Sequence, residues 1–583
     1  MNVSSAKLID FVRCARFAAL DKSFDSTIDI EDEIHNTLFF HRPESEIGFI
    51  DEEEGGFLDE CWGTDIHTDY RESFLKLVEQ ALVKHLGRPS ASNKRFTYPF
   101  RKDIILHQTI DFVYESEEEL IAITASLVSD RHLRNLDYRL GRNKVTIFAQ
   151  NGWYYHVSNE VRDALTQQGH HKLQRVFSHH EMTGRMLYDQ VFTQRVLTGN
   201  VPKKTRIILA LVHSDYVRSQ DDEMDIVTFI DVTDLAQLWV GRIETDLNRM
   251  INHIELDDSS RVMLVKNACM RGTRFACKYA EYCFSHIPKR NSLFAYFQHH
   301  LGFREGPGKA RLHDIYELLD EGIVDMMDMP ISWLQREKNL MQRYCVENDY
   351  FFVNKKKIRA KMSTLVYPVH YLDMEALPAP LPRFVGERPY TPSVFMFSVH
   401  TQHEPYGRLR HVDALITSND DHRKDIIEQL LEAIPEGDGS VVVFRQNFII
   451  ERMDEWIRLF PEYASRIDAI KARLFDLLLL VKNDYAFYQA LGYSKQEAST
   501  YNLYHPDQNG SYDLKAILSA FKKDPFADLE IKDRETCYRE YARSMTSKSK
   551  DKAIIFPRLR SYAQYVTESL ADILDGLWGE LEK

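Results

Sequence analysis

Apolar and polar positions along this chain follow strand-like patterns in some stretches and helix-like patterns in others. Residues 104–127 form two strand-like apolar runs around an acidic turn, and residues 367–376 form a short apolar strand. Residues 292–348 instead carry apolar side chains at helical spacing, with breaks at a GPG sequence and at Pro330. These patterns predict an α/β protein with a helical stretch in its middle.

The length of the chain predicts more than one domain. At 583 residues it exceeds one usual hydrophobic core, so we expect a domain at 1–290, a helical connector at 291–362 and a domain at 363–583. No apolar run approaches the length of a membrane span, and the N-terminus has no signal-peptide pattern. Seven cysteines in a chain of this length are not a secreted disulfide scaffold. We therefore expect a cytoplasmic protein without membrane association.

The charge of the chain is unevenly distributed. The net charge of -14 argues against nucleic-acid binding over the whole protein surface. Residues 25–60 are heavily acidic and are expected to be solvated. Residues 539–560 are instead rich in Lys and Arg, which predicts either a solvated segment or an arm that contacts phosphates. Two further basic groups, at 355–357 and 359–361, would extend such an arm. Nucleic acid and a protein are both conceivable partners.

Two acidic residues close the strand at 367–376. Asp373 and Glu375 are separated by one residue, so on a strand they point to the same face. Two carboxylates held that close repel each other unless a cation lies between them, and Mg²⁺ or Mn²⁺ prefers such oxygen ligands. The pair is therefore a candidate metal site, and a strand end with solvated acids is the alternative.

The C-terminal third resembles an uncharacterised bacterial domain family that is usually placed with RNase H-like DEDD exonucleases. In that resemblance Asp373 and Glu375 match the first acidic motif, and Asp476 matches a further acidic position. Such enzymes hold two metal ions with four acids for phosphodiester hydrolysis. The matching segments are, in order, YLDMEALPAPLPRFVGERPY, SVFMFSVH, IPEGDGSVVVF, FPEYASRIDAIKARLFDLL and YHPDQNGSYDLKAIL.

The chain departs from that family at two acidic positions. Ile449 and Val566 stand where the family pattern has acids, and Arg445 replaces an Asn. Glu451 and Glu568 lie two residues further on, which is about 200° of rotation on a helix, so neither readily substitutes. We expect a weakened or absent metal site.

Four cysteines form an early-plus-late set: Cys14, Cys269, Cys277 and Cys283. This arrangement resembles the iron-sulfur site of PD-(D/E)XK nucleases that are associated with CRISPR adaptation and with bacterial helicase-nucleases. The resemblance implies a [4Fe-4S] cluster on four thiolates. A zinc ion and inert buried thiols are the alternatives.

The catalytic core of the PD-(D/E)XK type is incomplete. Asp111 stands at the first acidic position, but Ala122 and Thr124 occupy the positions of the second acid and the Lys. Gln190 and Gln194 lie on a predicted helix, where either matches the active-site Gln of the family or is an ordinary helix-face residue.

Together these patterns predict a multidomain α/β protein with a PD-(D/E)XK-like domain, a helical connector and an RNase H-like domain. Two functions compete. The first is a degenerate nuclease that binds nucleic acid or a partner protein. The second is an active Mg- or Mn-dependent exonuclease that uses Asp373, Glu375 and Asp476.

Overall fold

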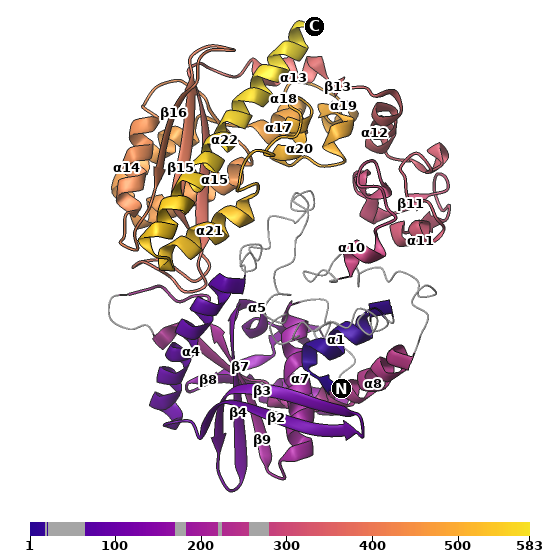
Figure 1. Cartoon of the computed structure of the whole chain (residues 1–583), viewed down its shortest axis with the longest axis vertical. Coiled ribbons are helices and arrows are strands. Elements are labelled where there is room, and N and C mark those ends of the chain that lie inside the picture. Colours follow the sequence, from indigo (N-terminus) through magenta and orange to yellow (C-terminus); the bar gives the residue numbers. More distant parts are fainter. Residues whose placement is uncertain are drawn as a thin grey trace. The chain divides into compact units, whose positions relative to one another are not determined.

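The described part of the chain forms two compact α/β units (Figure 1). The structure, a computed structural model, describes residues 1–14, 16–17, 20, 64–140, 142–168, 182–219, 224–255 and 279–583. The first unit contains the described residues up to Cys283 together with Pro378–Thr391, and the second contains Phe284–Leu377 and Pro392–Lys583. The residues of the expected connector belong to the second unit. The predicted multidomain α/β class is confirmed.

The first unit is built on a mixed eight-stranded sheet. Its strand order is β1-β3-β4-β9-β10-β8-β7, and β2 pairs with β3. The β4–β9 and β8–β10 pairs are parallel, whereas β3–β4 and β9–β10 are antiparallel. The strands are β1 (Asn2–Val3), β2 (Ala91–Arg101), β3 (Ile104–Glu115), β4 (Glu119–Ser129), β7 (Phe148–Asn151), β8 (Tyr154–Val157), β9 (Lys204–Val212) and β10 (Val227–Asp231); β5 (Asp137–Leu140) and β6 (Asn143–Thr146) pair separately.

Helices cover both faces of this sheet. Alternate residues of β9 enter different cores, because side chains alternate across a strand. Ile207 and Leu209 pack with α1, α7 and α8, whereas Ile208 and Ala210 pack with α4. The helices are α1 (Ser5–Arg13), α4 (Thr64–Leu86), α5 (Arg131–Arg134), α6 (Asn159–Gln168), α7 (Met182–Asn200), α8 (Thr233–Glu255) and α10 (Ala280–Cys283).

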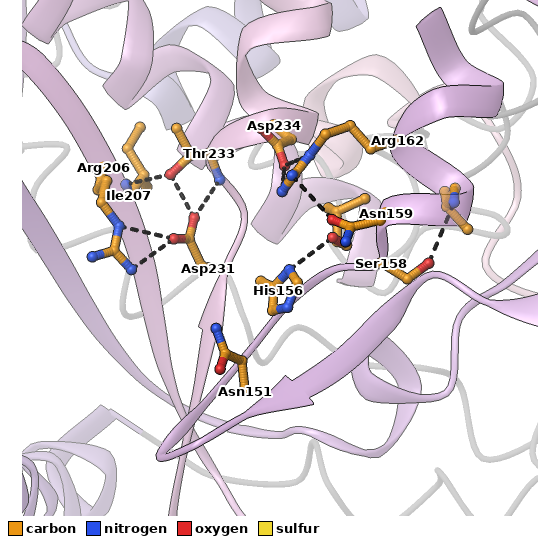
Figure 2. Close-up of polar contacts among 12 residues, drawn as sticks. Asn151, His156, Ser158, Asn159, Arg162, Arg206, Ile207, Asp231, Thr233 and Asp234 are labelled. Carbon is orange, nitrogen blue, oxygen red and sulfur yellow. Dashed lines mark hydrogen bonds and ion pairs between the residues drawn. The ribbon is translucent and has the colours of Figure 1, made fainter.

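A polar network ties the start of α8 to the sheet (Figure 2). Asp231 accepts two hydrogen bonds of 3.0 Å from the guanidinium of Arg206, and its other oxygen accepts one of 3.0 Å from the Thr233 N–H. The Thr233 hydroxyl in turn accepts a 2.9 Å bond from the Ile207 N–H. These contacts fix the junction of β10 and α8.

The second unit contains a five-stranded sheet with the order β16-β15-β14-β17-β18. The central strand β14 (Val369–Pro378) is buried at all ten positions, as its apolar pattern predicts, and β17 and β18 run parallel to it. The other strands are β15 (Pro392–Gln402), β16 (Arg410–Leu415), β17 (Val441–Val443) and β18 (Leu474–Asp476).

The two faces of this sheet are covered by different helices. Leu372 and Met374 pack into an apolar core with α14 (Arg423–Ala433), α15 (Gln446–Leu459) and α16 (Ala464–Lys471). On the other face, Tyr541 of α21 (Arg534–Thr546) stacks on Phe395 with ring centroids 3.7 Å apart. The long helix α22 (Ser549–Glu582) lies on that same face, because its Thr567 hydroxyl hydrogen-bonds to Ser398 and His400 of β15.

Shorter elements complete the second unit. Two small antiparallel strand pairs join β11 (Phe303–Arg304) to β12 (Leu312–His313) and β13 (Phe352–Val353) to β19 (Leu503–Tyr504). The remaining α-helices are α11 (Ile315–Asp320), α12 (Glu337–Asn348), α13 (Lys355–Met362), α17 (Leu477–Val481), α18 (Tyr485–Ala490), α19 (Lys495–Ser499) and α20 (Leu514–Ser519). Among the described residues, no helix is both long and apolar enough to cross a membrane.

Candidate functional site

The paired acids of β14 lie side by side and contact one arginine. Asp373 and Glu375 are 4% and 0% exposed. Arg534, the first residue of α21, donates from Nη2 to Oδ1 of Asp373 at 2.9 Å, and its Nε lies 3.2 Å from Oε2 of Glu375. The Asp533 side chain caps this helix by accepting a hydrogen bond from the Thr536 N–H at 2.7 Å. This cap fixes the start of the helix and therefore the position of the Arg534 backbone. A guanidinium therefore occupies the side of the pair where a cation was expected.

The charges at this position are strongly coupled. Burial raises the pKa of Glu375 well above its usual value; the charge of Arg534 lowers this pKa, and the neighbouring Asp373 raises it further. Burial lowers the pKa of Arg534, but Glu375 and Asp373 together raise it well above its usual range. The arginine therefore stays charged, and it compensates part of the repulsion that a metal ion would otherwise relieve.

Aromatic side chains surround this charged group. The Arg534 guanidinium lies 5.3 Å from the centroid of the Phe448 ring. Tyr538 of α21 and Tyr562 of α22 are both buried, and burial raises the pKa of each phenol well above its usual value. The Arg534 side chain keeps 35% exposure, so solvent reaches the group from the arginine side.

Asp476 lies on the opposite face of the sheet from the pair. The register aligns Tyr371 with Val442 and Val443 with Asp476, so Asp476 shares a face with Leu372 rather than with Asp373. Because of this register, the structure does not bring the three expected metal ligands together. A metal-binding role for the pair alone stays a prediction.

The carboxylate of Asp476 is instead used as a helix cap. It accepts hydrogen bonds from the backbone N–H groups of Arg445, Gln446 and Leu478 at 3.1, 3.0 and 2.9 Å. Burial raises its pKa, and these backbone bonds oppose the rise. This geometry fits the N-termini of α15 and α17, where a carboxylate satisfies unpaired N–H groups.

The two replaced acids have become core positions. Ile449 of α15 is 1% exposed and packs in the apolar core with Leu372. Val566 of α22 is 4% exposed. Glu451 is exposed and lies 3.5 Å from Arg452, so it is turned away from the core that Ile449 enters. Positions 449 and 566 therefore supply apolar side chains and no carboxylate.

The first unit repeats the pairing of an acid with an arginine. Asp111 of β3 accepts from Nη2 of Arg71 at 2.9 Å, and its other oxygen accepts from the Ala125 N–H at 2.8 Å. Ala122 of β4 lies opposite Val113 of β3 and is fully buried in the apolar core. Position 122, where a second acid was expected, therefore carries a buried methyl group. The first acid, Asp111, is already paired with Arg71.

Sequence reasoning missed a second acid close to Asp111. Burial raises the pKa of Asp189 on α7, hydrogen bonds from Ser5 and Gln108 lower it, and the charge of Asp111 raises it. Gln190 donates to the Asp189 carboxylate at 3.0 Å. Asp189 directly precedes Gln190 in the sequence, but its proximity to Asp111 depends on the packing of α7 against β3.

The second flagged glutamine has a structural partner. Gln194 donates from Nε2 to the Thr205 hydroxyl at 3.1 Å, and both side chains are buried. This contact links α7 to β9. It gives Gln194 the role of a buried hydrogen-bonding residue between a helix and a strand.

The structure brings two of the four grouped cysteines close to each other. Burial raises the pKa of the Cys283 thiol, nearby Arg16 lowers it, and the Cys14 thiol raises it. Both thiols are half-buried against the main core of the first unit, and neither is in a disulfide. Cys269 and Cys277 lie outside the described residues. A metal centre on these cysteines stays a prediction.

Part of the predicted basic track is internal. Lys357 is 1% exposed, and its Nζ donates to the carbonyl oxygens of Glu497 and Thr500 at 3.0 and 2.7 Å. Burial lowers its pKa to about 8. Lys361 pairs with Asp484 at 2.7 Å. The expectation that the basic groups at 355–357 and 359–361 extend a phosphate-contacting arm is therefore wrong for Lys357, because this side chain ties α13 to the C-terminal end of α19.

Comparison with known proteins finds a match for only part of the second unit. No curated protein matches the chain, and no solved structure matches it. A family model with the description "Domain of unknown function (DUF2779)" matches residues 370–513, which include Asp373, Glu375 and Asp476. Over these residues the chain is thus similar to a domain family whose function is unknown.

Proposed function

We propose that this chain is a nucleic-acid-binding protein of nuclease ancestry that does not cleave its ligand. In this proposal the first unit is PD-(D/E)XK-like and the second is RNase H-like. The observation that carries the proposal is the contact of Arg534 with both Asp373 and Glu375. Two-metal hydrolysis needs a cation at that pair, and a guanidinium provides charge without an open coordination position.

The rest of the second unit favours the same conclusion. Asp476 is engaged with three backbone N–H groups on the other face of the sheet. Ile449 and Val566 fill the remaining acidic positions with buried apolar side chains. Metal binding would have to displace Arg534 and would still rest on only two carboxylates. An ion held in this way would not stabilise both the attacking and the leaving oxygen.

The first unit supports the proposal independently. Arg71 pairs with Asp111, and the side chains of Ala122 and Thr124 supply neither a carboxylate nor an ammonium group. Loss of one preformed electrostatic group typically slows such a reaction by about 10²-fold or more. Two centres with the same pairing argue for a chain that has kept the scaffold without the cleavage chemistry.

The proposed binding surface lies at the start of α22. Lys548 and Lys550 are exposed, whereas Arg558 and Arg560 of the same segment pair with Glu530 and Asp413. Exposed lysines bind phosphates through charge, and this binding weakens as salt rises. The proposal includes a cysteine-bound [4Fe-4S] cluster, or alternatively zinc, at Cys14, Cys269, Cys277 and Cys283, which would hold the first unit together.

An assay with end-labelled single-stranded and duplex nucleic acids tests this proposal. We expect salt-sensitive binding, and no cleavage in Mg²⁺ or Mn²⁺ by the wild type or by Asp373→Asn. Lys548→Gln with Lys550→Gln should weaken binding, whereas the exposed control Lys495→Gln should not. Cleavage by the wild type that Asp373→Asn abolishes would establish the competing exonuclease function. Absence of binding would instead point to a protein partner.

A further inference from the structure

We propose that His313, Glu317 and Glu321 form a binding site for one zinc-like divalent ion in the second unit. His313 ends β12, Glu317 lies in α11, and Glu321 caps the C-terminal end of that helix. One ligand atom from each of the three side chains lies within 4.8 Å of those from the other two. This is the spacing at which three ligands can share one ion.

The imidazole of His313 is held with one nitrogen ready to bind. Its side chain is 3% exposed and stacks on Trp333 with ring centroids 4.5 Å apart. Nε2 lies 2.9 Å from Oε1 of Glu305. A carboxylate beside Nε2 favours the tautomer that carries its proton there, which leaves the lone pair on Nδ1.

That second nitrogen has no hydrogen-bond partner among the described residues. Nδ1 lies 3.7 Å from Oε2 of Glu317, which is too long for a direct hydrogen bond. A buried imidazole nitrogen that lacks a partner normally carries an energetic penalty. A cation bound between Nδ1 and Oε2 would remove that penalty, because it accepts electron pairs from both atoms.

The two glutamates are arranged to share an ion with this nitrogen. Residues 313, 317 and 321 are spaced by four, so they fall on one side of the turn that leads into and through α11. Oε1 of Glu317 accepts a 2.5 Å bond from Arg311, and this bond lowers the pKa of Glu317. Glu317 is therefore ionised, and its Oε2 faces His313.

The ligand types select the class of ion. An imidazole nitrogen with carboxylate oxygens suits Zn²⁺ and related transition ions, whereas Mg²⁺ and Ca²⁺ prefer oxygen alone. Three protein ligands leave a fourth position for water. Glu305 would act as the outer carboxylate that orients a metal-bound histidine. Arg311 offsets one of the three nearby glutamate charges, so the group keeps an excess of negative charge.

Binding would connect the β11–β12 hairpin to α11, the helix that follows it in the sequence. Glu305 follows β11 and His313 ends β12, so both belong to the hairpin that precedes α11. An ion held by His313 and by two residues of the helix would tie the hairpin to α11. We infer that the ion stabilises this part of the second unit rather than taking part in hydrolysis.

Zinc titration of the chelator-treated full-length protein tests the site. The Cys14→Ser background limits binding by the cysteine set. We expect Glu321→Gln and Glu317→Gln each to lower the zinc affinity at least 10-fold, because loss of an outer partner such as Glu305 already costs about 10- to 100-fold. Glu347→Gln removes an exposed acid from α12 and should leave the affinity unchanged.

Trp333 fluorescence gives a readout that is specific to this location. Zinc should change the emission of the wild type, and this change should be absent in Trp333→Phe and shifted to higher zinc in Glu321→Gln. His313→Gln should abolish the response, and the exposed Glu321 keeps the test valid if the buried His313 variant does not fold. Equal affinity and an equal fluorescence change in the wild type and in Glu321→Gln would overturn the proposal.

Discussion

Arg534 donates a 2.9 Å hydrogen bond to Asp373, although 161 positions separate the two residues in the sequence. The bond joins the start of α21 to the centre of the buried strand β14. Asp373 is 6% exposed in its side chain and Arg534 is 35% exposed. A carboxylate that is this deeply buried needs a cation nearby, so Arg534 contributes to the folding stability of the second unit.

The first prediction concerns the cost of removing this arginine. Arg534→Met should destabilise the second unit by about 3 kcal/mol, at the lower end of the range for broken buried ion pairs because solvent reaches the guanidinium. Amide hydrogen exchange in β14 measures this free energy locally. Adding Asp373→Asn and Glu375→Gln should recover most of the loss. An unchanged exchange rate in Arg534→Met would show that the pair contributes nothing.

The second prediction is that removal of the arginine exposes a cation site. In Arg534→Gln, Asp373 and Glu375 lose their compensating charge, so Mn²⁺ should bind and raise the thermal midpoint. The wild type should show no such rise. Arg534→Gln combined with Asp373→Asn is the matched control and should lose the effect. A wild type that Mn²⁺ stabilises as strongly as it stabilises Arg534→Gln would contradict this explanation.

Local sequence was sufficient to predict the acids of the candidate sites and their strands. The alternation of β14 placed Asp373 and Glu375 on one face, which holds because side-chain direction on a strand depends only on parity. The apolar runs at 104–127 correctly gave β3 and β4. These features are local, so they need no knowledge of distant contacts.

The partners of those acids could not be predicted in this way. Arg71 is 40 positions from Asp111, and Arg534 is 161 positions from Asp373. No spacing rule connects such residues, because the contact depends on how a helix packs on the sheet. Asp476 shows a second limit: its type matched a metal ligand, but the strand register turned it to the other face, where it caps α15 and α17.

The third prediction concerns acid sensitivity from a buried histidine. Burial, together with the charge of nearby His411, lowers the pKa of His400 to about 4. The unfolded chain, with a His pKa near ~6.5, then binds more protons than the folded one between pH ~6.5 and about 4. Stability is therefore retained above that window and falls as the pH falls through it, by an amount on the order of 3 kcal/mol.

The test compares unfolding of the wild type and of His400→Gln across this pH range. The variant should lose much of the acid-dependent decline, because glutamine does not titrate and can still hydrogen-bond to Thr567. His422→Gln is the control, because the His422 side chain is 42% exposed. Parallel pH profiles of the wild type and His400→Gln would show that this histidine does not set the acid limit.

The last prediction concerns the cysteines of the first unit. Cys14 and Cys283 are far apart in the sequence but lie close together in the first unit, and their thiols are half-buried. A cluster that also recruits Cys269 and Cys277 would supply folding energy, because thiolate ligands are organised only in the folded chain.

Protein purified without oxygen should then be brown and contain iron and sulfide, and Cys14→Ser should lose both and unfold more readily. Cys345→Ala is the matched control, because Cys345 lies in the second unit and outside the proposed set. Zinc at one equivalent without sulfide would select the alternative ion. A colourless protein that lacks all three elements, with Cys14→Ser as stable as the wild type, would leave the two thiols as ordinary core residues.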